Sequence, residues 1–249
     1  MVKAGLRLHD AKNSPMKTWL RLSSLLAVGG ALALTAQTAR ADLVYDNSTN
    51  DLNINFGAGT YYTNEIGDEV ILTPGTWIIT NFIFQYWGLN FSGSEQAEVR
   101  FYANNGPLAS GWPSPGTLLY DSGTFSIGAT TRSTLVFDLS SLTVGVPVPL
   151  TGPVPNDFTW SVTFSDLGSS ASAGVSLYGT TSNTFGAGWS YPDYWLNTAG
   201  GWELMSSNNL PINPAAQFYA EPAPEPTVIV FGLLGGLSLL ALKLRNAQK

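Results

Sequence analysis

The sequence predicts an all-β protein, with a single β-sandwich domain of jelly-roll type over residues 42–220. Three observations carry this prediction. Apolar and polar residues alternate along much of this central region, turn-forming residues separate the alternating stretches, and no stretch there has a helical period of useful length. The long apolar runs lie instead near the two ends of the chain, where we expect a signal peptide and a membrane-spanning helix.

The clearest predicted strand covers residues 158–165, where large apolar side chains such as Trp160 share one face and Thr and Ser share the other. Residues 97–103 alternate in the same way. Further strands are expected at residues 69–72, 77–87, 118–121, 133–139, 174–178 and 217–220. Turns are expected at residues 74–75, 106–107, 113–116 and 156–157, which contain Pro, Gly, Asn or Asp. A sandwich and a barrel share this pattern, and we favour the sandwich.

Residues 1–41 are predicted to be a signal peptide with an N-terminal extension. Lys17 and Arg21 precede the apolar run 25–34, and the small residues Ala39 and Ala41 then lie three and one positions before the expected cleavage site at Asp42. This apolar run is too short to span a bilayer as a retained anchor. Met16 would open a conventional signal peptide, so translation from Met1 or from Met16 fits the sequence.

Residues 221–249 have three parts in a fixed order. A proline-rich spacer contains Pro224, Glu225 and Pro226. A predicted membrane helix then covers residues 227–242 and rises about 24 Å, and a basic tail begins at Lys243. The basic residues after the helix predict that the C-terminus is cytoplasmic and that the large domain lies outside.

This C-terminal arrangement resembles the PEP-CTERM sorting signal of Gram-negative bacteria, although the basic residues Lys243, Arg245 and Lys249 are more dispersed than is usual there. The resemblance implies that the chain is a substrate of an exosortase, a membrane transpeptidase. It implies an inner-membrane-anchored precursor that is cut near Pro224-Glu225-Pro226 and moved to the cell surface or the extracellular matrix. The expected partners during export are signal peptidase, the exosortase and the membrane. A simple tail anchor is the alternative.

Charge and composition exclude several classes of function for residues 42–220. This region contains 14 acidic residues and only two basic ones, Arg100 and Arg132, which leaves a formal charge of −12 and argues against nucleic acid as a partner. The chain has no cysteine, and its one histidine, His9, lies in the segment expected to be removed. The region therefore lacks the residues needed for any mechanism that uses cysteine, histidine or lysine as nucleophile or base.

Carboxylates remain as candidates for catalysis or metal binding. Glu65, Asp68, Glu69, Glu95 and Glu98 could converge, but their spacing shows no acid and nucleophile pair, and Glu98 is expected on a solvated strand face. Asp46 and Asp51 bound the best candidate calcium loop, which local turns explain equally well. We therefore expect no cofactor, with Ca²⁺ as the weak alternative, and no enzymatic activity.

Aromatic residues gather near the end of the domain, at positions suited to a carbohydrate. Flat rings beside Asn and Asp can stack on sugars, and packing of these rings as a loop over the sandwich is the favoured alternative. The candidate sugar-binding residues are Trp189, Tyr191, Tyr194, Trp195 and Trp202.

The sequence thus predicts an exported, non-enzymatic surface or extracellular-matrix protein with a structural or adhesive role in exopolysaccharide. A carbohydrate-binding module is the second hypothesis, and a glycan-cleaving enzyme is the third.

Overall fold

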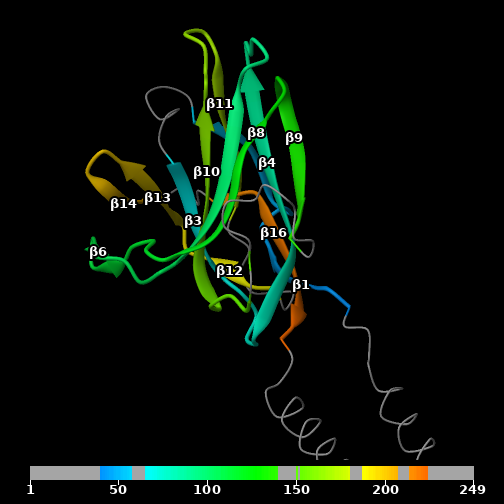
Figure 1. The fold of residues 1–249 in the computed structure, drawn as a ribbon, viewed down its shortest axis with the longest axis vertical. Coiled ribbons are helices and arrows are strands. Elements are labelled where there is room, and N and C mark those ends of the chain that lie inside the picture. The colour runs from blue at the N-terminus through cyan, green and yellow to red at the C-terminus, as the bar shows by residue number, and fades with distance from the viewer. Residues whose placement is uncertain are drawn as a thin grey trace, which may run out of the picture. The chain divides into compact units, whose positions relative to one another are not determined.

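The computed structural model describes residues 40–57, 65–139, 150, 152–179, 187–206 and 213–223. The described residues form an all-β, sandwich-like fold of antiparallel sheets (Figure 1). Within this part of the chain, no helix is long and apolar enough to cross a membrane. Ala39, the predicted membrane helix 227–242 and the Pro224-Glu225-Pro226 motif lie outside the described residues.

One sheet, named sheet A here, has seven strands, in which β1, β16, β4, β11 and β15 are successive neighbours. In addition, β9 pairs with β4 and β2 pairs with β11. The strands are β1 (Asp42–Asp46), β2 (Asp51–Phe56), β4 (Trp77–Leu89), β9 (Thr130–Asp138), β11 (Ser172–Tyr178), β15 (Asn213–Pro214) and β16 (Ala216–Pro222).

The other sheet, sheet B, also has seven strands, in which β14, β13, β3, β10, β5 and β8 are successive neighbours and β12 pairs with β3. The strands are β3 (Glu65–Ile71), β5 (Gln96–Ala103), β8 (Leu118–Ser126), β10 (Asp157–Ser165), β12 (Trp189–Ser190), β13 (Asp193–Thr198) and β14 (Gly201–Ser206). A separate hairpin of β6 (Leu108–Ala109) and β7 (Trp112–Pro113) follows β5 and contacts β14.

Aromatic rings join the two sheets through the core. Phe82 of sheet A lies 5.2 Å from Phe101 and 5.1 Å from Trp160 of sheet B, measured between ring centroids. Phe218 of sheet A packs on Phe101 and on Phe158 in the same way. These rings are almost completely buried, so the inner faces of both sheets form one apolar core.

The predicted strands with clear alternation are confirmed, including β10, where Trp160 faces the core. Every predicted strand overlaps one in the structure, and β3 and β8 are longer than predicted. The prediction missed β1, β2, the short strands β6, β7 and β15, and the strands β12 to β14. Residues 189–206 alternate poorly because apolar and aromatic side chains lie on both faces of β13.

Strands β1 and β16 pair at the two boundaries predicted for the domain. Asp42, the residue after the expected signal cleavage, is the first residue of β1 and pairs with Ala220. Strand β16 ends at Pro222, two residues before Pro224. Because these strands are antiparallel neighbours, the two ends of the folded region leave the same end of sheet A.

Candidate functional site

The outer face of sheet B is polar but largely covered. Since Phe158, Trp160 and Val162 face the core, Thr159 and Ser161 face outward, and both are nevertheless fully buried. Gly67 of β3 lies beside them, and a Cβ atom there would stand 2.8 Å from Thr159 Cγ2 and 3.1 Å from the Trp160 carbonyl oxygen. This part of the face therefore depends on a residue with no side chain.

Glu65 is the centre of a hydrogen-bonded cluster on this face. Its carboxylate accepts hydrogen bonds from the Tyr102 hydroxyl at 2.9 Å and the Ser161 hydroxyl at 2.5 Å, through Oε1, and from the Asn197 amide at 3.0 Å, through Oε2. The ring of Trp202 packs edge-on against Tyr102 at 5.6 Å. Five strands (β3, β5, β10, β13 and β14) thus contribute to this buried carboxylate, its partners and its cover.

Arg100 neutralises this cluster. Its guanidinium lies 2.6 Å from Glu98, 3.1 Å from Asp121 and 3.7 Å from Glu65. Glu98 faces outward as predicted, but it is ion-paired and mostly covered rather than solvated. Of the carboxylates considered from sequence, Glu65 and Glu98 therefore meet at one arginine.

A second group of carboxylates lies toward the other end of the same face, and we name Glu69, Asp157 and Asp193 the acidic row. Strand β3 carries Glu69 and is flanked by β10, which begins at Asp157, and by β13, which begins at Asp193. Glu69 pairs with Thr159 in the register of β3 and β10, so Asp157 lies two residues along the same face. Like charges on neighbouring strands are destabilising unless something compensates them.

The electrostatics of the acidic row reflect this crowding. Burial, followed by the charge of Asp157 and a hydrogen bond with it, raises the pKa of Glu69 to about 7. Burial also raises the pKa of Asp193. The Asn104 amide donates a hydrogen bond to Asp157 and, through its oxygen, accepts one from Thr159. Both arginines of the domain are occupied elsewhere, Arg100 at Glu65 and Arg132 at Asp51.

Aromatic rings border the acidic row. Tyr191 lies two residues before Asp193, and its pKa is raised by burial and by the charges of Glu69, Asp157 and Asp193, in that order. The Tyr191 ring lies 4.6 Å from that of Trp189 and 6.0 Å from that of Trp112. Trp112, on the β6–β7 hairpin, is 54% exposed. This hairpin lies on the same side of the fold as β13 and β14 (Figure 1).

The five candidate sugar-binding residues do not form one platform. Tyr194 and Trp195 are buried, so neither offers a ring face to a ligand, and Tyr194 packs edge-on against Phe56 at 4.9 Å. Trp202 covers Tyr102. Trp189 and Tyr191 remain half-buried beside the acidic row. Trp112 was not among the candidates selected from sequence, because it lies about 80 residues before Trp189 and Tyr191 along the chain.

The weak calcium candidates have other roles in the structure. Asp46 accepts hydrogen bonds from the backbone N–H and the hydroxyl of Ser48, and Asp51 accepts one from the Asn53 N–H while it pairs with Arg132. These are the local turns considered as the alternative. Within the described ranges, no group of three or more acidic, histidine or cysteine side chains is placed to hold a metal ion.

The two other carboxylates considered from sequence, Glu95 and Asp68, belong neither to the Glu65 cluster nor to the acidic row. Glu95 accepts three hydrogen bonds from Ser92 and Gly93, which lower its pKa to about 2. Asp68 faces the interior, where burial and then the charge of Asp193 raise its pKa well above the usual value. Among the described residues, one Asp68 oxygen finds no hydrogen-bond partner. Neither residue joins an acid and nucleophile pair.

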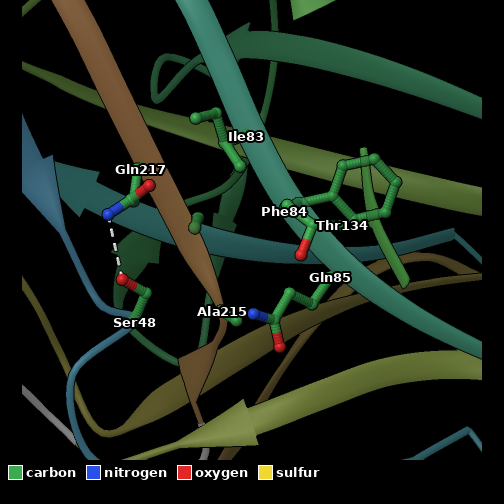
Figure 2. Close-up of a pocket in the computed structure, with 8 residues that line it drawn as sticks. Ser48, Ile83, Phe84, Gln85, Thr134, Ala215 and Gln217 are labelled. Atoms are coloured by element: carbon green, nitrogen blue, oxygen red, sulfur yellow. Dashed lines mark hydrogen bonds between the residues drawn. The ribbon is translucent and has the colours of Figure 1, made fainter. Parts of the chain in front are cut away.

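The outer face of sheet A carries a small pocket of about 220 Å³, shown in Figure 2. Its walls are mostly amides, hydroxyls and aliphatic groups. The Gln217 amide donates to the Ser48 hydroxyl at 3.0 Å and to Asp46 at 3.2 Å, and Gln85 accepts from the Tyr178 hydroxyl at 2.9 Å. Among the described residues, none that lines this pocket has a charged side chain.

No protein-family model, no curated protein and no solved structure matches this chain. The acidic row is the feature that sequence reasoning missed most completely. One signal was available, because a domain with 14 acidic residues and two arginines must leave most carboxylates without a basic partner. Sequence spacing alone does not say which of them meet.

Proposed function

We propose that the chain is an exported, non-enzymatic surface or matrix protein, sorted by an exosortase-type system, with a structural or adhesive role within extracellular polysaccharide. The observation that carries this proposal is the ordered C-terminal sequence: Pro224-Glu225-Pro226, the apolar segment 227–242 and the basic residues from Lys243. The pairing of Asp42 with Ala220 is compatible with it, because removal of the segments before Asp42 and after Pro222 would leave both strands whole.

Processing tests this proposal directly. In a host with an exosortase, intact mass of the surface-recovered protein should show a chain that begins at Asp42 and lacks residues 227–249. Replacement of Pro224, Glu225 and Pro226 by alanines should leave an unprocessed precursor in the inner membrane. A parent protein whose main surface form still contains residues 227–249 would contradict the sorting proposal.

The absence of enzymatic activity is part of the proposal. Several carboxylates of the domain are held in structural pairings, as at Glu65 with Arg100 and at Glu95 with Ser92. Glu69 and Asp157 are hydrogen-bonded neighbours, whereas glycosidases separate their two carboxyl groups by about 5 to 9.5 Å to admit the sugar and water. A direct hydrogen bond leaves no room for a glycosidic bond between them. Release of reducing ends from the host polysaccharide by the purified protein would contradict this part.

We also infer that eight of the strands form a jelly roll. Support comes from the pairing of strands in nested order along the chain: β5 with β8, β4 with β9, β3 with β10, and β1 with β16. This nesting is what results when one long hairpin of eight strands is wrapped into two sheets. Strands β13 and β14 then extend sheet B beyond the eight.

Carbohydrate binding by the domain is a second candidate function, which one observation favours. Trp112 is an exposed ring beside Tyr191 and Trp189, next to unneutralised carboxylates that can accept hydrogen bonds from sugar hydroxyls. Electrophoresis of the full-length protein, solubilised in non-ionic detergent, through a gel that contains the host's own exopolysaccharide tests it. Retardation supports binding, and unchanged mobility contradicts it while the sorting proposal stands.

A further inference from the structure

Four buried polar side chains connect the two sheets inside the fold, and we name Tyr45, Asp68, Ser190 and Asn213 the Asp68 cluster. Tyr45 and Asn213 belong to sheet A, through β1 and β15, whereas Asp68 and Ser190 belong to sheet B, through β3 and β12. The Tyr45 hydroxyl donates a hydrogen bond to the Ser190 hydroxyl at 2.9 Å. The Asn213 amide donates to the Ser190 hydroxyl and to the Tyr191 carbonyl, and lies 3.5 Å from Asp68 Oδ1. Polar contacts therefore hold the sheets together here.

Asp68 has no cation beside it. Its side chain is completely buried, and the residue pairs with Trp160 in the register of β3 and β10. Arg100 and Arg132 are the only basic residues between positions 42 and 220, and both are ion-paired with other carboxylates. Because an ionised carboxylate without a cation is strongly destabilising in a protein interior, the folded chain favours the neutral acid at Asp68.

The hydrogen bonds of the cluster also call for a proton on Asp68. Asp68 Oδ2, Asn47 Oδ1 and Asn213 Oδ1 are buried acceptors with no partner in the described part of the chain. The Tyr45 hydroxyl lies within hydrogen-bonding reach of Asp68, but it has one hydrogen, which it donates to Ser190. Toward Asp68 it can only accept. The hydrogen between these two side chains therefore comes from the Asp68 carboxyl group.

No titratable neighbour offsets a negative charge on Asp68. Burial, followed by the charges of Asp193 on β13 and Glu69 on β3, raises the pKa of Asp68 well above its usual value. On β1, burial and then the charge of Asp68 raise the pKa of Tyr45, and Asp46 acts in the same direction. The strands β10, β12 and β15 contribute side chains that do not ionise: Trp160, Ser190 and Asn213.

We propose that Asp68 is a proton-controlled lock between the two sheets. As a neutral acid it donates to Tyr45 and keeps β1 and β15 bound to β3 and β12, and loss of its proton at higher pH opens these contacts reversibly. Strand β12 carries Trp189 and leads to Tyr191, so the same opening loosens two of the rings that border the acidic row. The inference goes beyond both proposed functions and depends on neither.

Hydrogen exchange measured by mass spectrometry tests the lock. The full-length protein in non-ionic detergent is exchanged at pH 5, 6 and 7, and each rate is corrected for the intrinsic pH dependence of exchange. Because each opening releases one proton, the opening equilibrium of peptides covering residues 42–47, 188–191 and 213–216 should rise about tenfold per pH unit. A peptide covering residues 97–103, in the middle of sheet B, should change less. Equal pH dependence in all four peptides would overturn the proposal.

The variant Asp68→Asn separates this proton from others. Asparagine has nearly the shape of the neutral acid and cannot ionise, so it should remove about tenfold per pH unit from the rise in opening. Asp138→Asn, at an exposed position of β9, is the matched control and should leave the rise unchanged. Thermal melts at pH 5 establish that both variants are folded. An Asp68→Asn variant with the pH dependence of the parent would contradict the lock.

Infrared spectroscopy detects the proton without any change at Asp68. Glu69→Gln removes the neighbouring carboxyl group whose pKa is about 7. At pH 7 this variant should still show the carbonyl stretch of a neutral carboxylic acid, since Asp68 remains buried and protonated while the fold is closed. Bands of ionised carboxylates alone would overturn the proposal, whether or not Asp68→Asn folds.

A calcium ion is the competing occupant, because a carboxylate and two amide oxygens are also ligands that Ca²⁺ accepts. Exchange of the peptides covering residues 42–47 and 213–216 is therefore compared before and after treatment with EGTA, and again after addition of CaCl₂. We expect no change in either step. Faster exchange after EGTA that CaCl₂ reverses would show that a metal ion holds the sheets together, and would overturn the proton lock.

Discussion

The outer faces of the two sheets differ in how their charged side chains are paired. On sheet A, Arg132 binds Asp51 and lies over the Tyr178 ring, and Gln217 in the Figure 2 pocket donates a hydrogen bond to Ser48. On sheet B, Arg100 serves Glu65, Glu98 and Asp121, and the acidic row beyond it has no arginine or lysine of the domain. Arg132 thus pairs with one carboxylate on sheet A, whereas Arg100 is shared by three on sheet B and the acidic row has neither arginine. The exposed Trp112 lies on the same side as this row, so sheet B is where we place the proposed carbohydrate binding.

The largest expected effect concerns the core that supports both faces. Trp160→Ala should lower the free energy of unfolding by about 3 to 5 kcal/mol, because a completely buried indole is removed between the two sheets. Urea unfolding of the full-length protein in detergent measures it. Val136→Ala, at an exposed position, is the control and should change stability by no more than about 0.5 kcal/mol. A Trp160→Ala variant as stable as the parent would refute the packing described here.

The two arginines provide the most direct comparison of the faces. Arg100→Met should cost about 2 to 3 kcal/mol, because it leaves the buried Glu65 and two further carboxylates without their cation. Arg132→Met should cost about 0 to 1 kcal/mol, since the side chains of its pair with Asp51 are about one-third exposed. The same unfolding measurement applies. Equal costs would remove the distinction between the faces.

The pH dependence of stability sharpens the comparison. Glu69 has a folded pKa of about 7, above its ordinary value of 4.5, so the folded state keeps a proton that the unfolded state has lost. The contribution of Glu69 to the free energy of unfolding should therefore be largest below about pH 4.5, and it should fall as the pH rises to about 7. Burial raises the pKa of Asp193 and gives the same sign.

Melting temperatures of the parent and of Glu69→Gln between pH 4.5 and 8 measure this contribution. The parent should lose more stability across the interval than the variant, which cannot titrate at position 69. Asp51→Asn on sheet A is the matched control, and its carboxyl pKa is lowered by Arg132 instead. Parallel curves for Glu69→Gln and the parent would contradict the raised pKa.

The smallest expected effect on stability is at Trp112. Because more than half of this side chain is exposed, Trp112→Ala should change the melting temperature little. Trp195→Ala, at a buried ring of the same face, should lower it clearly. A large loss for Trp112→Ala would show that the ring is a packing element rather than a free surface.

Strand alternation made most of the fold predictable from sequence. The period of two in residues 158–165 and 97–103 placed Trp160 and Phe101 in the core, because each of these strands has an apolar inner face. The same rule failed at β13, where Tyr194 and Trp195 are buried on opposite faces. It also predicts that Thr159 and Ser161 are exposed on the opposite face, whereas both are buried and hydrogen-bonded, to Asn104 and Glu65 respectively.

The candidate site was predictable only in part. Trp189 and Tyr191 were selected because aromatic residues cluster in the sequence there, and they do border the site. Asp157 and Trp112 are brought to them by β10 and by the β6–β7 hairpin, which are distant along the chain. Such a cluster depends on which strands become neighbours, and local patterns carry no information about that pairing.

One measurement tests most directly whether sheet B is the binding face. The indole N–H signals of the tryptophans report on separate regions: Trp112, Trp189 and Trp195 at the acidic row, Trp77 and Trp87 on sheet A, and Trp160 in the core. Nuclear magnetic resonance spectra of the ¹⁵N-labelled full-length protein in detergent would be recorded during titration with oligosaccharide fragments of the host's own exopolysaccharide. We expect shifts at Trp112, Trp189 and Trp195 and none at Trp77 or Trp87. Shifts confined to Trp77 and Trp87, or no shift at all, would contradict this expectation.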